Sequence, residues 1–223
     1  MLAMVSAAGP ELSVLAGRRA AARSTWSASL SHVFDVSREV LRRVTAEIVA
    51  GCLESRTFLK GSVNDVGLSN VVIDDLLANY PIRLESPFEN TASIAGGLWS
   101  GRALFGAAYE DALAKLDFSA GTLDLPMHVH EHSDRFIVVA EGHARFWWSE
   151  ESLNSFTGMR VESVEVRRGD VLVFTRGLMH TFSAPQDSLL LLSFHSPEIA
   201  FNDPRQFTLP SIIWAPRMAQ TVR

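Results

Sequence analysis

The sequence has few of the residues that mark several large classes of protein. Cysteine occurs once, at Cys52, in a chain of 223 residues. An intramolecular disulfide is therefore excluded, and a reducing compartment is expected. The hydrophobic runs are far shorter than the roughly 20 residues that a membrane-spanning helix needs. The sequence has no basic segment followed by an unbroken apolar run, which is the pattern of a secretory signal. We therefore expect a cytoplasmic protein with no membrane-spanning part.

Basic charge is also scarce. The 20 Lys and Arg residues are outnumbered by 25 Asp and Glu, which gives a net charge of -5. A chain of this charge has no broad basic field for nucleic acid or an anionic membrane. The sequence also has no glycine-rich phosphate loop and no recognisable setting for a serine or cysteine nucleophile. We therefore expect a small-molecule substrate or ligand and no nucleic-acid partner.

The N-terminal part of the chain predicts an arm followed by a helix. Residues 1–34 are rich in Ala, Ser and Arg and hold a single acid, Glu11, which is typical of a poorly ordered or docked arm. Apolar residues then recur three and four apart from Val36 onward, as on one face of a helix. Asp35 or Ser37 is the expected N-cap of that helix.

A second helix is predicted over residues 69–80, because Ser69 is a good N-cap and Pro81 ends the pattern. The two helices, joined by a glycine-containing connection, make up a helical segment over residues 35–85. We expect this segment to form a dimer contact or a lid. The stretch around Gly67 also resembles a helix-turn-helix, but its second helix has no Lys or Arg to meet phosphates.

Beyond residue 85 the pattern changes to short apolar runs separated by turn residues, which is typical of many short strands. These runs cover residues 92–99, 102–109, 112–118, 136–140, 144–148, 160–166, 171–174 and 189–194. An antiparallel sandwich or barrel is the architecture that this pattern favours. Residues 86–223 are therefore predicted to form one mainly β domain with a C-terminal tail.

Histidines cluster in this domain, with four of the seven in residues 128–143. Residues two apart in an extended strand point to the same face, so His128 and His130 can bind one ion together. A second segment begins at Gly169 as a buried strand and runs through a glycine turn to His180. Neutral imidazole suits Fe, Zn, Ni and Cu and, less strongly, Mn.

These two segments resemble the two sequence motifs of the cupin superfamily, and the resemblance covers roughly residues 95–200. The matching positions are Gly121, His128, His130 and Gly142 in the first motif, and Gly169, Gly177 and His180 in the second. The resemblance implies a mainly β fold, a cupin jelly-roll β-barrel, with the α-helical segment before it. It further implies a homodimer and one divalent metal ion held by the three histidines, with Fe(II) favoured and Zn, Mn, Ni or Cu as alternatives.

The chain departs from the first motif at Arg135, which stands where the family usually has a metal-binding Glu. A guanidinium about 5 Å from a divalent ion would be repelled by roughly 6–7 kcal/mol at an effective dielectric near 20. Arg135 therefore either pairs with Asp134 or Glu131, or binds an anionic substrate that also reaches the metal, or indicates a barrel without metal. The planar fork of Arg suits a carboxylate, so we expect a catalytic role in orienting substrate.

The function that these residues favour is a metal-dependent enzyme acting on a small acidic or enolizable molecule, most simply a non-haem iron dioxygenase. The alternatives are a ligand-sensing cupin with a degenerate helix-turn-helix, and a metal-dependent isomerase or lyase. Outside the three metal-site residues, His132 and His143 are expected to be solvated. His195 is a candidate for orienting substrate at the mouth of the barrel.

Overall fold

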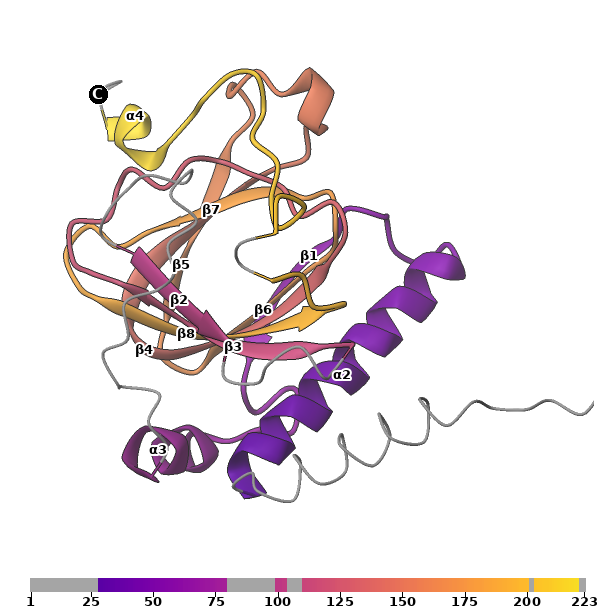
Figure 1. Cartoon of the computed structure of the whole chain (residues 1–223), viewed down its shortest axis with the longest axis vertical. Helices are drawn as coiled ribbons and strands as arrows, with labels where there is room; N and C mark the ends of the chain where they lie inside the picture. Colours follow the sequence, from indigo (N-terminus) through magenta and orange to yellow (C-terminus); the bar gives the residue numbers. More distant parts are fainter. Residues whose placement is uncertain (1–27, 80–98, 104–109, 201–202, 221–223) are drawn as a thin grey trace, which may run out of the picture.

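The computed structural model describes residues 28–79, 99–103, 110–200 and 203–220. Over these residues the chain is mainly β, with eight strands that wrap into a jelly-roll barrel (Figure 1). The strands are β1 Phe58–Ser62, β2 Trp99–Ala103, β3 Ala112–Phe118, β4 Asp134–Ser149, β5 Glu162–Arg167, β6 Asp170–Phe174, β7 Met179–Ser183 and β8 Leu189–Ser196. The helices are α2 Ala28–Val49, α3 Asn70–Asn79, the 3₁₀ turn η2 Leu153–Ser155, and α4 Pro216–Gln220.

Strand β4 joins the two halves of the barrel. Its first half pairs with β6 and β8, and its second half pairs with β5 and β7, all antiparallel. The change of partners follows a bulge between Val139 and Glu141 and takes place at Gly142, whose φ is +87°. The two runs predicted over residues 136–140 and 144–148 are therefore one bent strand.

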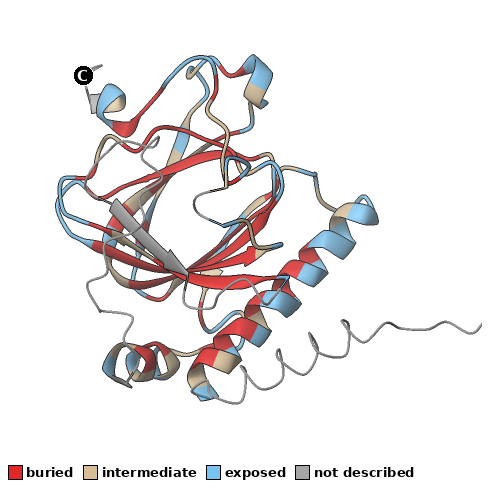
Figure 2. Ribbon diagram, in the orientation of Figure 1, coloured by how far each residue is buried: buried red, intermediate tan, exposed pale blue. Residues whose placement is uncertain are grey.

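The strands alternate between an outer face and the interior of the barrel, as the period of two requires. On β8, Leu190, Leu192 and Phe194 belong to a cluster that also holds residues of the two long helices. Leu189 and Leu191 belong to the interior cluster instead. Figure 2 shows the resulting buried layer between helix α2 and the sheet. The helices thus cover the outside of the sheet, and the interior remains available for a site.

Helix α2 lies across the outer face of the sheet, against β4 and β8 (Figure 1). The expectation of a lid over the barrel is therefore wrong for this helix. The predicted start near Val36 is also wrong, because the helix already includes Ala28. Ser37 is no N-cap: it is buried inside the helix, and its Oγ donates to the Val33 carbonyl oxygen at 2.6 Å. None of the helices in the described part of the chain is long and apolar enough to span a membrane.

In the sequence, strand β1 comes between helices α2 and α3, where a glycine-containing connection was predicted. It pairs antiparallel with β6, so residues 58–62 form part of the barrel sheet. The helix-turn-helix interpretation is therefore wrong, because a strand and not a helix precedes the turn at Gly67. Helix α3 itself begins directly after Ser69, as predicted.

The predicted strands after residue 110 agree with the structure to within about two residues at most ends. The run predicted over 112–118 matches β3, and those over 160–166, 171–174 and 189–194 match β5, β6 and β8. Strand β7 was not predicted. The arm expected over residues 1–34 and the run expected over 92–99 lie mostly outside the described residues. Of the run expected over 102–109, only the first two residues are described, and they belong to β2.

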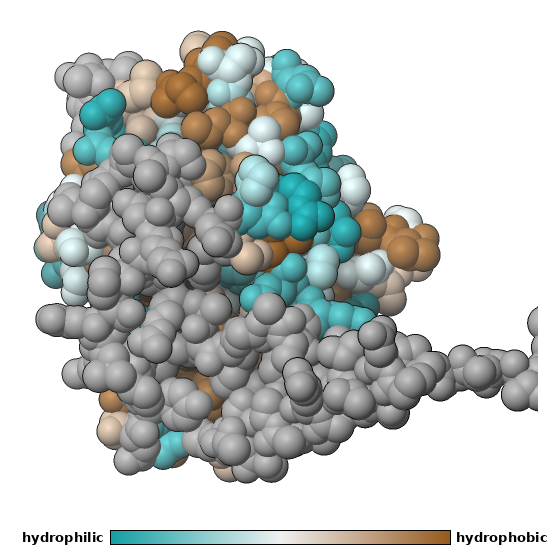
Figure 3. Space-filling view, in the orientation of Figure 1, coloured by the Kyte–Doolittle hydropathy of each residue, from teal (hydrophilic) through white to brown (hydrophobic). Residues whose placement is uncertain are grey.

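The end of the barrel opposite α3 is closed by the C-terminal part of the chain. Trp214 packs against Trp147 of β4 with ring centroids 5.5 Å apart. Apolar residues gather on the surface at this end, at the top of Figure 3. Ile212 and Ile213, next to Trp214, are about half exposed. This closure brings residues 203–215 across the barrel and next to its interior.

The packing of α2 on the sheet makes a first prediction. Phe34 is fully buried and meets the Phe194 ring edge-on, with ring centroids 4.9 Å apart. Phe34→Ala is expected to lower the free energy of unfolding by about 3–5 kcal/mol, because it leaves a cavity under the helix. Urea denaturation measures this. Val49→Ala on the same helix is the control, since Val49 is 83% exposed and its truncation should change stability by less than about 0.5 kcal/mol. Similar values for the two variants would contradict the packing.

Candidate metal centre

The two histidine segments are joined through their backbones. The His128 N–H donates to the His180 carbonyl oxygen at 3.0 Å, and the His180 N–H donates to the His128 carbonyl oxygen at 2.9 Å. The Gly177 N–H donates to the His130 carbonyl oxygen at 2.9 Å. Gly177 has φ +83°, which a glycine adopts without strain. The turn before His180 thus holds the segment that carries His128 and His130.

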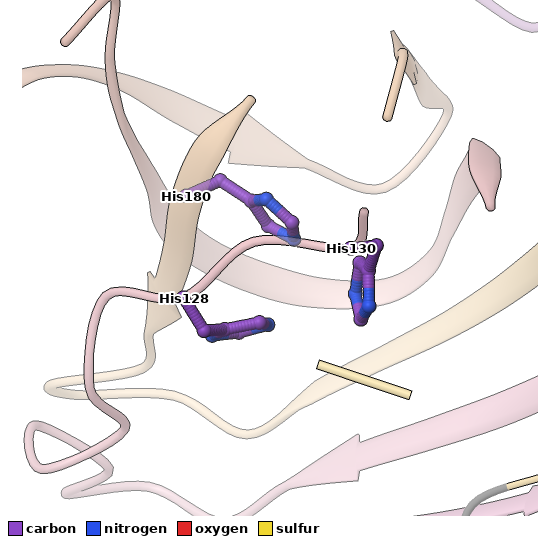
Figure 4. A group of neighbouring side chains, drawn as sticks. All are labelled: His128, His130 and His180. Atoms are coloured by element: carbon purple, nitrogen blue, oxygen red, sulfur yellow. The ribbon is translucent and has the colours of Figure 1, made fainter. Parts of the chain in front are cut away.

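The three imidazoles point toward one another inside the barrel (Figure 4). Ring centroids of His128 and His180 are 4.6 Å apart, and those of His130 lie 5.1 Å from each. One ligand atom from each ring lies within 4.8 Å of the other two. The three atoms therefore lie close enough together to be candidate ligands of one ion, which histidine nitrogens bind at about 2.0–2.1 Å.

Backbone carbonyls orient each ring. Nδ1 of His128 lies 2.9 Å from the Pro126 oxygen, and Nδ1 of His180 lies 2.9 Å from the Leu178 oxygen. Nδ1 of His130 is hydrogen-bonded to the Gln206 oxygen. A carbonyl can only accept, so each Nδ1 carries the proton and each Nε2 keeps its lone pair. This is the arrangement that outer hydrogen bonds give to metal-binding histidines.

Burial keeps the three imidazoles neutral. It lowers the pKa of His128 to about 4, and it lowers the pKa values of His130 and His180 well below the ordinary range. The nearby Arg135 charge lowers all three further. A metal ion therefore competes with few protons at neutral pH. The site has the donor type, protonation state and spacing that a divalent ion requires.

Arg135 lies in the same cavity, 2% exposed. Its guanidinium donates to Ser133 Oγ, to the Asp134 carbonyl oxygen at 3.2 Å, and to Gln206 Oε1 at 3.4 Å. All three acceptors are uncharged. Burial lowers the pKa of Arg135 to about 9, so the side chain is still a cation at neutral pH.

The two carboxylates that were candidates to pair with Arg135 are hydrogen-bonded to other groups. Asp134 accepts from the backbone and guanidinium of Arg176, with the salt bridge at 2.8 Å. Glu131 is exposed and accepts from Thr208 Oγ1 at 2.7 Å. The first of the three interpretations of Arg135 is therefore wrong.

The cavity beside the three histidines measures about 60 Å³, taken as the volume open to the centre of a water-sized sphere. Its polar wall consists of the three histidines, Arg135, Ser193, His195 and Gln206, and its apolar wall of Leu116, Phe118, Leu125, Ile137, Phe174, Phe182 and Phe207. On this measure each water-sized group needs roughly 10–15 Å³. The cavity therefore has room for several such groups, which suits a small molecule.

Of the other histidines, two were predicted from the sequence to be solvated, and this prediction is confirmed. His132 and His143 are exposed. His195 is buried and lies on the cavity wall, beside Arg135 in the β4–β8 register. Gln206 and Ser193 were not predicted as site residues. Gln206 follows the last strand in a segment without periodicity, and no local pattern places it near His130.

Comparison with protein families matches residues 110–209 to the family described as Cupin. The matched segment contains His128, His130, His180 and Arg135. Together with the jelly-roll barrel, this match identifies residues 110–209 as a cupin domain. Cupins typically bind a metal through histidines, so the three converging imidazoles agree with the family. A search of curated proteins finds no match.

Several solved structures are similar to part of this chain, at low identity and with low TM-scores. An oxalate decarboxylase from Lactobacillus farciminis is 18% identical, with a TM-score of 0.39; the alignment covers 51% of this chain and 31% of that one. A DMSP lyase from Ruegeria pomeroyi is 16% identical, with a TM-score of 0.39, covering 51% of that chain and 50% of this one. An uncharacterised double-stranded β-helix protein from Klebsiella pneumoniae is 14% identical, with a TM-score of 0.40, covering 57% of this chain and 100% of that one. The chain thus spans about a third of the decarboxylase and half of the lyase.

Proposed function

We propose that this chain is a metal-dependent enzyme that acts on a small carboxylic acid, most simply as a non-haem iron oxygenase. One observation carries the proposal. Three neutral imidazoles with converging Nε2 atoms share a small cavity with Arg135, a buried cation whose hydrogen bonds to the described residues include no carboxylate. The three histidines suit a divalent cation, and Arg135 suits an anion bound next to it.

His128, His130 and His180 would hold the ion. Three protein ligands leave coordination positions open, which is what a catalytic metal requires. Imidazole donors suit Fe, Zn, Ni and Cu, and we favour Fe(II). A bound Fe(II) ion would supply the electrons that dioxygen activation needs, whereas Zn would polarise a ligated carbonyl or carboxylate.

Arg135 would orient the substrate. Its side chain is held at one end of the cavity by Ser133 and Gln206, so little conformational freedom is lost when it binds. The planar guanidinium can donate two parallel hydrogen bonds to a carboxylate. A bound carboxylate would also screen the repulsion between Arg135 and a divalent ion. Arg135, which stands where the family usually has Glu, would thus bind the substrate carboxylate beside the metal.

The same hydrogen bonds make Arg135 the residue to change. Arg135→Gln is expected to raise the Kd of small carboxylates by about 10–100-fold, because hydrogen bonds to a charged partner contribute roughly 1.5–3 kcal/mol. Isothermal titration calorimetry measures this. Arg145→Gln is the matched control, since Arg145 also lies on β4 but pairs with Glu165 outside the cavity. Equal carboxylate affinity in wild type and Arg135→Gln would remove Arg135 from the proposal.

The reaction class is tested by oxygen uptake. Iron-reconstituted protein should consume dioxygen in the presence of one or more small carboxylates or diketones, and the histidine variants should not. Turnover without oxygen uptake would replace the oxygenase with a metal-dependent lyase or isomerase. Tight binding without turnover would make the chain a ligand-sensing cupin.

A further inference from the structure

The inward face of strand β8 changes from apolar to polar beside the candidate metal centre. Leu189 and Leu191 point into the barrel core, but the next two inward positions are Ser193 and His195. Both are buried, 1% and 3% exposed, and both line the cavity. A leucine at either position would keep the strand's alternation and pack in the barrel, so packing alone does not explain why these two inward side chains are polar.

The two residues are hydrogen-bonded to each other and lie close to Arg135. Nε2 of His195 lies 2.9 Å from Ser193 Oγ. In the β4–β8 register Arg135 is opposite His195, and Ile137 is opposite Ser193. Inward side chains at such positions are neighbours on one face of the sheet. Burial lowers the pKa of His195 well below its ordinary value, and the Arg135 charge adds to this, so the imidazole is neutral.

The hydroxyl of Ser193 keeps hydrogen-bonding capacity after it meets His195. A hydroxyl has one donor and two acceptor lone pairs. If His195 donates to Oγ, the Ser193 proton is directed to another acceptor; if Ser193 donates, Oγ can accept from another donor. In both cases the hydroxyl can bind a further oxygen in the cavity. Ser193 and Arg135 both line this small cavity, so one ligand can contact both.

From this arrangement we infer that the substrate is a short carboxylic acid that carries an oxygen, as a hydroxyl or oxo group, on the carbon next to the carboxylate. Arg135 binds the carboxylate, and Ser193, oriented by His195, binds the second oxygen. This inference rests on the proposed function and narrows it to short 2-hydroxy or 2-oxo acids, which suit a cavity of this volume.

Calorimetric binding of three acids of nearly equal size tests the inference: propionate, lactate and pyruvate. The full chain as purified should bind lactate or pyruvate at least tenfold more tightly than propionate. Ser193→Ala should reduce that ratio at least tenfold and leave the Kd of propionate within about threefold of wild type. Chelation of a bound ion by the second oxygen affects both proteins alike, so it cancels when the ratios are compared.

Two further variants support the comparison. Ser183→Ala is the matched control, because Ser183 is a buried serine on β7 whose Oγ accepts from Trp147 outside the cavity; it should keep the wild-type ratio. Ser193→Cys nearly preserves the shape of the side chain but is a weak donor and acceptor. It should also lose most of the ratio, and it provides the test if Ser193→Ala does not fold.

The outcomes separate this inference from the proposed function. Equal affinity for the three acids in wild type, or a ratio that Ser193→Ala leaves unchanged, overturns the assignment of Ser193 while a carboxylate site remains. Failure of wild type to bind any of the three acids, or binding that Arg135→Gln leaves unchanged, overturns the carboxylate site itself and the inference with it.

Discussion

Replacing His128 and His130 together with alanine is expected to remove the metal from the protein. Protein purified without a histidine tag should contain close to one divalent ion per chain, and the double variant less than about a tenth of that. The reason is that His180 alone cannot hold an ion that needs three converging Nε2 atoms, and the described residues contain no other group of three candidate ligands. Elemental analysis by mass spectrometry measures the content directly.

The control for this variant is the double replacement of His132 and His143, which are exposed and stand outside the cavity. That protein should keep its metal. Equal metal in both double variants would place the ion elsewhere. Wild-type protein that takes up no metal even after reconstitution would mean that the barrel is an anion-binding pocket built on Arg135.

Gly142→Ala is expected to destabilise the protein more than any surface substitution. A Cβ at this position would lie 1.9 Å from the Ser188 carbonyl oxygen, and the backbone φ of +87° disfavours any side chain. Because the clash is with backbone, the strand cannot relax without disturbing the register of β4 and β8. We expect a loss of at least about 3 kcal/mol in the free energy of unfolding, measured by urea denaturation.

Gly51→Ala separates the two causes. Gly51 has a similar φ of +74°, but a Cβ there meets nothing within 4 Å. Its replacement should cost only the backbone preference, about 1–2 kcal/mol. A Gly142→Ala protein no less stable than Gly51→Ala would show that β4 and the turn before β8 are not so close.

The sequence predicted the elements that local patterns specify. Strand β3 and helix α3 follow from runs of apolar residues with a clear period and clear ends. Strands β1 and β7 were missed. Both are five residues long, and β1 contains Lys60 and Gly61, which are uncommon in strands. The structure shows that pairing with β6 holds β1 in place, and this long-range contact has no local signal.

The residues of the candidate site were likewise predictable from the sequence only in part. His128 and His130 were predicted to share a face from their spacing, and His180 from its place in the second motif. The surroundings of Arg135 were not predictable, because Gln206 comes from the C-terminal segment and Asp134 turns to Arg176 instead. Contacts that depend on where distant segments meet the barrel are set by tertiary packing, and no single stretch of sequence contains them.

The position of β1 has a consequence for any attempt to separate the cupin from what precedes it. The strand covers the edge of β6, and its register runs from Phe58 opposite Phe174 to Ser62 opposite Asp170. A fragment that began at residue 86 would leave the N–H and C=O groups of that edge without partners. Such edges recruit strands from neighbouring molecules. Strand β1, which precedes the family match, therefore covers an edge at which barrels could otherwise associate, and the shortest soluble form of this cupin should begin ahead of β1.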